Sequence, residues 1–280
     1  MLCAGWTDSA QILYALRTRH GAILSGLECL HYTHEHEGCD MHGHLLNLMI
    51  KLPFIMETLD VVMRTNNKSE RPALNQLLQL CSSLNAQLLA WHEKLKIEVH
   101  GQLYWTVPSI AKNPADDPNL GSIFPLAFHF PSLKLAQLLL LYWSTLILLF
   151  RTTQDIQKRL KRKATSGIAT PHPVGQRDRN KSELCSNNNY PPDDRMLHLA
   201  NNISQSLEYC YHRKNGTLGP QSTIFAVWAA ESVYESLSDK RRELTWCSEL
   251  GNMTAPDSRF DLHVIKFSAD GYGTLLTSLL

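Results

Sequence analysis

The stretch LKLAQLLLLYWSTLILLF, residues 133–150, is apolar on almost every side of a helix and decides how the rest of the chain must fold. A membrane span needs about 20 apolar residues. This run is shorter and contains Gln137, Ser144 and Thr145. We therefore predict a central core helix that is contacted on all sides. The alternative is a single-pass membrane protein anchored by residues 133–150.

The segments on either side of this run have helical periodicity. Steps of four and three residues place one set on a single helix face, namely Leu77, Cys81, Leu84, Leu88, Trp91 and Leu95. A second set with the same property is Met196, Ala200, Ile203, Leu207 and Cys210. Pro72 marks the start of the first helix, and His100-Gly101 marks its end. No segment has the sustained period-two alternation of a strand.

Three further segments are also predicted to be helical. The helical pattern from Leu45 to Met63 continues through Pro53, so we expect a kink there and not two separate helices. Residues 219–237 are apolar on most sides and predict a buried helix, followed by a short helix that carries Trp246. The sequence thus predicts an all-α fold: an irregular multi-helix domain of roughly seven helices around a central buried apolar helix.

The composition changes in one long segment. Residues 165–192 hold four prolines and an Asn triplet but few large apolar side chains. Such a segment buries too little surface to offset the entropy lost on ordering. We predict a mobile loop or linker within a single domain of residues 1–280.

Charge excludes a broad DNA-binding surface but points to one local site. Lys and Arg number 27 against 26 Asp and Glu, so the net charge is only +1, whereas phosphate binding needs a basic excess. The local candidates follow the apolar run and are Lys158, Arg159, Lys161, Arg162 and Lys163. Such runs serve nuclear import or nucleic-acid contact. The alternative is a solvated helix end whose cations favour the helix dipole.

Residues 29–44 concentrate seven potential metal ligands: Cys29, His31, His34, His36, Cys39, His42 and His44. Thiolates and imidazoles suit zinc, but this spacing matches no zinc module and no second clustered pair exists. We favour a polar connector between two helices and predict no metal and no cofactor. A metal-binding helical enzyme that uses residues 29–44 is the alternative.

No other feature of the sequence suggests catalysis. The motifs G-x-S-x-G, G-x-x-x-x-G-K-[ST], H-E-x-x-H and G-x-G-x-x-G are all absent, so we expect no catalytic residues and no enzyme. The seven cysteines are scattered without a C-x-x-C pair, which favours reduced core thiols. The phrases Leu103-Tyr-Trp and Leu141-Tyr-Trp are interpreted as core, because Tyr and Trp bury large areas.

Short phrases follow one another in a characteristic order along the chain. They are residues 50–57 (IKLPFIME), 84–91 (LNAQLLAW), 103–109 (LYWTVPS), 128–133 (FHFPSL), 141–145 (LYWST), 200–210 (ANNISQSLEYC), 218–221 (LGPQ) and 241–247 (RRELTWC). Together they resemble the regulatory region of fungal transcription factors with a six-cysteine binuclear zinc cluster. The similarity covers roughly residues 10–250, and residues 251–280 form a divergent tail.

The resemblance implies an all-α domain that regulates or dimerises a transcription factor in the nucleus, often beside genes for secondary metabolism. The family's zinc cluster, which contacts DNA, is absent here, as in a truncated zinc-cluster protein. We therefore expect a transcription-regulator-like protein that acts by protein contacts, as a homodimer or with a full-length related factor. We expect no sequence-specific DNA binding by this chain alone and no membrane association.

Overall fold

The fold is described by a computed structural model over residues 4–24, 40–65, 70–165 and 192–262. Its α-helices are α1 (Ala4–Thr18), α2 (Met41–Met49), α3 (Lys51–Thr65), α4 (Glu70–Val99), α5 (Leu133–Thr165), α6 (Pro192–Tyr211), α7 (Leu218–Ser236) and α8 (Arg241–Ser248). Short 3-10 turns occupy Gly21–Leu24, Arg213–Asn215, Leu250–Asn252 and Phe260–Leu262. The prediction of an all-α fold with roughly seven helices is confirmed. The predicted loop, residues 165–192, lies almost wholly outside the described residues.

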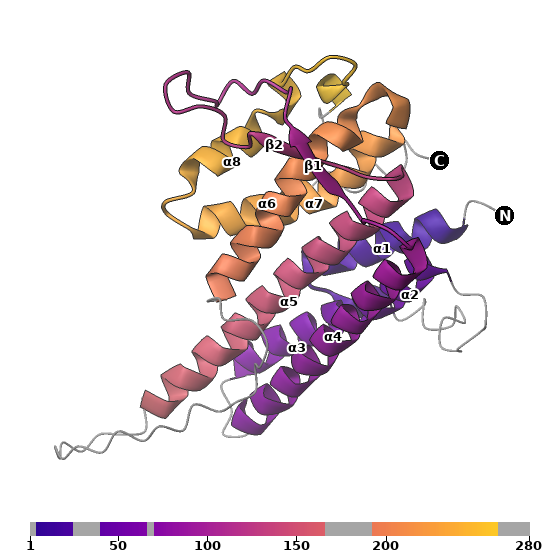
Figure 1. Cartoon of the computed structure of the whole chain (residues 1–280). Coiled ribbons are helices and arrows are strands. Elements are labelled where there is room, and N and C mark those ends of the chain that lie inside the picture. Colours follow the sequence, from indigo (N-terminus) through magenta and orange to yellow (C-terminus); the bar gives the residue numbers. More distant parts are fainter. Residues whose placement is uncertain (1–3, 25–39, 66–69, 166–191, 263–280) are drawn as a thin grey trace.

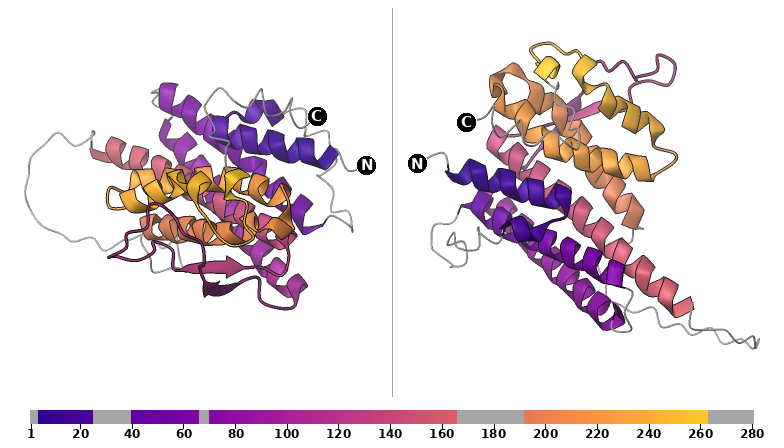
Figure 2. Two further views of the ribbon diagram at one scale, coloured as in Figure 1. Left: turned by 90° about the horizontal axis from the view of Figure 1, so that it is seen from above. Right: turned by 180° about the vertical axis from the view of Figure 1, so that it is seen from behind.

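Helix α5 is the centre of the molecule. Helices α6 and α7 pack against one side of it and α4 against the other (Figures 1 and 2). From residue 138 to residue 149 every side chain except Leu141 is buried, which confirms the predicted central helix. The hydroxyls of Ser144 and Thr145 donate to carbonyl oxygens one turn earlier, at 2.6 and 2.7 Å. The polar side chains inside the run therefore keep hydrogen-bond partners without leaving the core.

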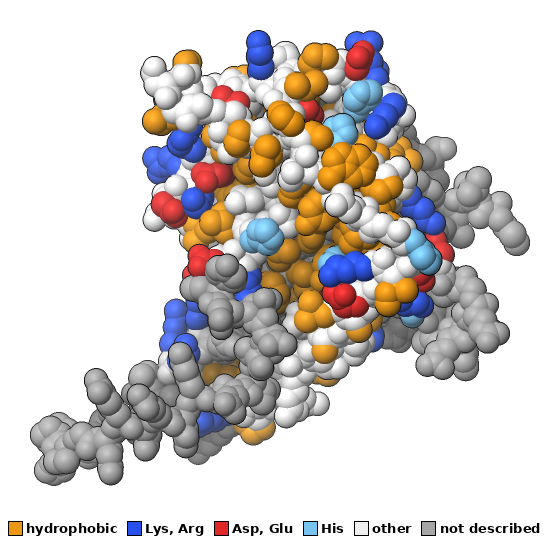
Figure 3. All heavy atoms as spheres, in the orientation of Figure 1, with side chains coloured by type: hydrophobic (Ala, Val, Ile, Leu, Met, Phe, Trp, Pro, Cys, Tyr) orange, Lys and Arg blue, Asp and Glu red, His pale blue; other side chains and the backbone are white. Residues whose placement is uncertain are grey.

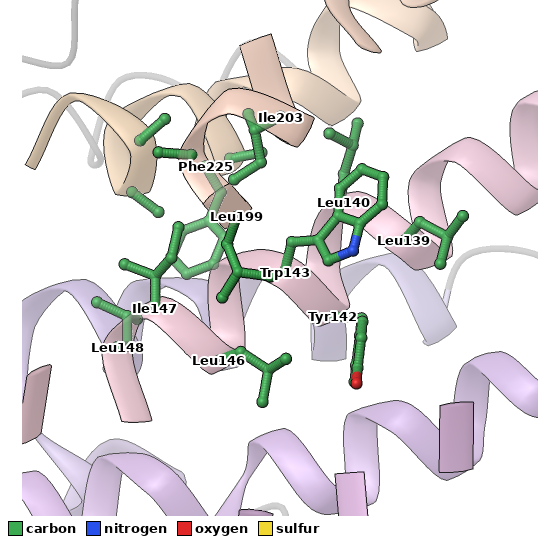
Figure 4. Packing of buried hydrophobic residues seen from close by; sticks show 14 of the residues in the cluster. Leu139, Leu140, Tyr142, Trp143, Leu146, Ile147, Leu148, Leu199, Ile203 and Phe225 are labelled. Atoms are coloured by element: carbon green, nitrogen blue, oxygen red, sulfur yellow. The ribbon is translucent and has the colours of Figure 1, made fainter. Parts of the chain in front are cut away.

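The two sides of α5 contact different halves of the chain. Figure 4 shows Leu140 and Trp143 pointing toward α6, where Ile203 lies, and Tyr142 pointing the opposite way. The ring of Tyr142 stacks on His92 of α4, with centroids 4.8 Å apart. Burial raises the pKa of the Tyr142 hydroxyl, so the group stays neutral. Because both sides are filled, the buried residues of α1 to α8 form one continuous apolar cluster.

The apolar faces that the sequence periodicity predicted for α4 and α6 are the faces that these two helices bury. All six predicted side chains of α4 and all five of α6 are buried. Helix α4 ends at Val99, and His100 follows with a left-handed φ of 51°, as the His-Gly pair predicted. The indole nitrogen of Trp91 donates to the Met41 carbonyl at 3.0 Å, which joins α4 to α2.

The prediction of one kinked helix across Pro53 was wrong, because α2 and α3 are separate helices that meet at Ile50. A continuous helix would place the proline ring against the carbonyl of Met49, four residues earlier. With the break at Ile50, Pro53 is the third residue of α3. There its missing N–H leaves no hydrogen bond unmade.

The prediction that no strand forms was also wrong. The strands β1 (Trp105–Pro108) and β2 (Leu126–His129) pair antiparallel, with Trp105 opposite His129. Glu208 of α6 holds the chain that follows β1 by accepting a 2.7 Å bond from the Ser109 hydroxyl, and bonds of 3.3 Å from the next two backbone N–H groups. Trp105 is 40% exposed, so its interpretation as core was wrong, while Leu103, Tyr142 and Trp143 are buried.

Truncation inside α5 tests its central position. Leu139 is fully buried, and Leu139→Ala should lower the free energy of unfolding by about 2–5 kcal/mol, since it removes a buried isopropyl group and leaves a cavity. Urea denaturation followed by circular dichroism measures this. The matched control is Leu120→Ala, because Leu120 is 70% exposed in the loop between the strands, where about 0.5 kcal/mol or less is expected. Equal effects of the two substitutions would contradict a central α5.

Candidate functional site at the basic end of helix α5

The predicted basic run lies on the last turns of α5, beyond Ile156, the last fully buried side chain among those that the structure describes in this helix. This end of α5 extends past the start of α6 in Figure 1. Lys158, Lys161 and Arg162 are exposed, and Arg159 is partly buried. The side chain of Lys163 lies outside the described part. The structure therefore divides the run into exposed cations and one that is held against the fold.

Arg159 is held by Glu70, the first residue of α4. Its Nε donates to one carboxylate oxygen and its Nη2 donates to the other at 3.3 Å. Glu70 is only 3% exposed, and its hydrogen bonds raise the pKa of the Arg159 guanidinium. A carboxylate at a helix N-terminus is favoured by the dipole, but a buried one also needs a cation. Arg159 is therefore a structural residue that anchors the end of α5 to α4.

A small hollow lies beside this ion pair, between α1, α3 and α5. Its volume is about 130 Å³, and it is lined by Arg19, Leu59, Asp60, Met63, Asp155, Lys158, Arg159 and Arg162. Arg19 has a left-handed φ of 60° and donates to both oxygens of Asp60 at 2.8 Å. Two carboxylates thus stand among four cations, so the hollow has no uniform positive field for an anionic ligand.

A second hollow lies at the opposite end of the molecule, near the start of α7. It has a volume of about 360 Å³ and is lined by Arg213, Gly216, Thr217, Arg259 and Asp261. Asp261 accepts a 3.3 Å hydrogen bond from Arg259. Both arginines are exposed to solvent. Neither hollow encloses a set of groups arranged as a nucleophile, a base and an orienting partner.

The predicted His/Cys segment is described only at its end. Cys29, His31, His34, His36 and Cys39 lie outside the described residues, while His42 and His44 belong to α2. Within the described ranges, no group of three or more His, Cys, Asp or Glu side chains could hold a metal ion. Burial lowers the pKa of His42. This keeps the imidazole neutral at neutral pH, the form that a metal would require.

Asp40, which lies within residues 29–44, has a structural role. Its carboxylate accepts from the Gly43 N–H at 3.0 Å and from Lys134 Nζ at 3.0 Å. The Gly43 bond, as the larger cause, lowers the pKa of Asp40. Asp40 therefore caps α2 and joins it to the start of α5.

The described cysteines agree with the interpretation of reduced core thiols. Cys81, Cys210 and Cys247 are free and buried. Burial raises the pKa of Cys210 to about 12, so the thiolate needed for metal binding or nucleophilic attack does not form near neutral pH. These thiols fill space between helices.

The packing of α5 argues against the alternative of a single-pass membrane protein. Leu133–Arg162 is long and apolar enough to cross a membrane, but 72% of its most apolar window is buried inside the fold. A core helix has this pattern. Insertion into a bilayer would have to break the contacts of α5 with α4, α6 and α7.

Compared with known proteins, the chain matches no family model, and no curated protein or solved structure is similar to it. Of the site residues, the sequence indicated the cations of α5 but missed Glu70, Arg19 and Asp60. Glu70 is 89 residues away from Arg159, and no local spacing signals a pair formed across the fold.

The Glu70–Arg159 pair can be tested by a double-mutant cycle. Glu70→Ala should lower Tm by several degrees, because it leaves the Arg159 guanidinium beside a buried gap. Adding Arg159→Ala should recover part of the loss. The matched control is Glu98→Ala, an exposed glutamate on the same helix, which should leave Tm nearly unchanged. Thermal denaturation measures the Tm of each variant. If the double variant loses as much Tm as the two single variants added together, the pairing is contradicted.

Metal content tests residues 29–44. We expect the purified chain to contain less than about a tenth of an equivalent of zinc, since a structural site is normally filled. Elemental analysis of the chain and of the variants His34→Ala and Cys39→Ala measures this. A full equivalent in the unmodified chain that is lost in both variants would contradict the prediction of no metal.

Proposed function

We propose that this chain is a nuclear, transcription-regulator-like protein that acts by protein contacts and has no DNA-binding zinc cluster of its own. It would regulate a secondary-metabolite gene cluster together with a full-length related factor or a second copy of itself. The observation that carries the proposal is the ordered set of phrases resembling the regulatory region of fungal zinc-cluster factors. The proposal concerns a regulatory protein and not an enzyme.

The positions of these phrases support the proposal. Residues 84–91 lie in α4, residues 141–145 in α5 and residues 200–210 in α6. Each phrase supplies buried side chains to the shared core. A resemblance that lies in packing residues concerns the fold as a whole and not one local motif. Similarity of this kind supports a shared fold, and it supports a shared function by analogy.

The exposed cations of α5 support the nuclear part of the proposal. Lys158, Lys161 and Arg162 lie on one side of the helix end, at spacings of three and four residues, and are exposed. A receptor can contact them there without unfolding the core. Arg159 is not part of this surface, since it is bound to Glu70. The import surface is therefore smaller than the sequence run.

Localisation tests the proposal. In a fluorescent fusion of the full chain, Lys158→Ala, Lys161→Ala and Arg162→Ala combined should reduce the nuclear-to-cytoplasmic ratio at least about fivefold, because the charge that the receptor recognises is removed. The matched control replaces three exposed arginines elsewhere, Arg213, Arg241 and Arg242, with alanine. It should leave the ratio unchanged.

Two results would overturn the proposal. One is exclusion of the unmodified fusion from the nucleus, and the other is equal accumulation of both triple variants. Circular dichroism of each purified variant shows that the chain remains folded. Arg159 is left in place in both variants so that loss of the Glu70 pair cannot explain the result.

A further inference from the structure

Helix α4 buries one face and exposes another face that has no charge. From residue 72 to residue 92 its sequence contains no Asp, Glu, Lys or Arg. The centre of the outward face is formed by small and amide side chains, all exposed: Asn75, Gln79, Ser82, Ser83, Ala86 and Ala90. In Figure 3 few charged side chains lie on the described surface along which Figure 1 places α4.

An exposed helix normally keeps its outer face charged for solubility. This chain follows that rule elsewhere, since the exposed end of α5 carries Lys158, Lys161 and Arg162. On α4, by contrast, Leu80 and Leu89 are 47% and 48% exposed at the edges of the uncharged face. Depletion of charged side chains distinguishes the centre of a protein interface from the rest of a surface, and the two leucines add apolar area at the edges of this face.

The residue types suit contact with a copy of the same face. Small side chains at Ser82, Ser83, Ala86 and Ala90 let a second helix approach closely. The amides of Asn75 and Gln79 both donate and accept hydrogen bonds. In an antiparallel pair centred between Ser82 and Ser83, Gln79 is level with Ala86 and Asn75 with Ala90 of the other copy, so each amide meets a small side chain. Surfaces with this self-complementarity form two-fold symmetric pairs.

The charges at the two ends of the face fix the direction of such a pair. Arg71 precedes the uncharged stretch and Glu93 follows it. They are 22 positions apart, or about six helical turns, so they lie on nearly the same side of α4. In an antiparallel pair centred between Ser82 and Ser83, Arg71 of one copy lies within about one residue of the level of Glu93 of the other. A parallel pair would instead place arginine beside arginine.

We propose that α4 forms the interface of a homodimer, in which two copies pack antiparallel through the uncharged face and pair Arg71 with Glu93 at both ends. This names the partner in the protein contacts proposed above and rests on that proposal. Glu93 already accepts a 2.7 Å bond from Lys96 within the chain, and it is 65% exposed. The carboxylate therefore keeps room for a second cation. The helix has 30 residues, or about 45 Å, so it is long enough for a specific contact.

The test measures the mass of the purified full chain by sedimentation equilibrium across a range of concentrations. The unmodified chain should be a dimer at micromolar concentration. Gln79→Lys should raise the dissociation constant at least about tenfold, because it places a cation without a counter-charge inside the contact, at the level of Ala86 of the other copy. Gln221→Lys is the matched control, since Gln221 is an exposed glutamine at the start of α7. It should leave the constant unchanged.

A charge swap tests the antiparallel direction. Arg71→Glu and Glu93→Arg should each raise the dissociation constant about fivefold. The double variant should return it close to that of the unmodified chain. Thermal denaturation of every variant separates loss of association from loss of folding.

Three results would overturn the proposal: a monomer at all concentrations, a dimer that Gln79→Lys does not weaken, or a double variant as weak as the two single variants combined. If the uncharged face binds only a different protein, the purified chain would be a monomer at all concentrations. The measurement uses purified protein and does not depend on nuclear import. A failed dimer and a failed nuclear role are therefore distinguishable.

Discussion

The burial of helix α5 on all sides is the constraint on which the rest of the structure depends. Of the twelve side chains from residue 138 to residue 149, all but Leu141 are buried. Neighbouring helices must surround this run, because its apolar surface would otherwise remain in water. Helices α6 and α7 cover one side and α4 the other. Each of these helices reaches α5 from a distant part of the sequence. Their positions are then fixed by a few polar links, such as the 2.7 Å bond from Arg151 of α5 to the Ser232 carbonyl of α7.

Patterns that repeat within one helix were predictable, whereas pairs that form across the fold were not. The buried faces of α4 and α6 follow from the period of the α-helix, because residues three or four positions apart lie on the same face and share one environment. The strands β1 and β2 have only four residues each, so alternation has no length over which to appear. Glu208, which holds the chain after β1, lies 99 residues from Ser109. A carboxylate at such a distance gives no local signal.

The same holds for the candidate site: a group of residues adjacent in sequence was predicted, whereas a contact between residues distant in sequence was not. The sequence identified five cations at the end of α5 as one group. The fold separates them, because Glu70 is buried at the start of α4 and requires a counter-charge. Arg159 supplies it. Lys158, Lys161 and Arg162 remain at the surface. Which cation of the run has a structural role was decided by Glu70, a residue that no spacing rule connects to the run.

Helix α4 links the core to the surface proposed for dimerisation. Its inner face is fixed by the contacts of Trp91 and His92 with Tyr142 of α5, and its first residue holds the end of α5 through Arg159. A helix anchored along its length and at its start has little freedom to rotate, so its outer face keeps one orientation. Pre-organisation of this kind lowers the entropy lost on association. It also means that pairing through α4 would set the spacing between the two exposed basic ends of α5. The geometry of the dimer would then determine how far apart two copies present their cations to a common partner.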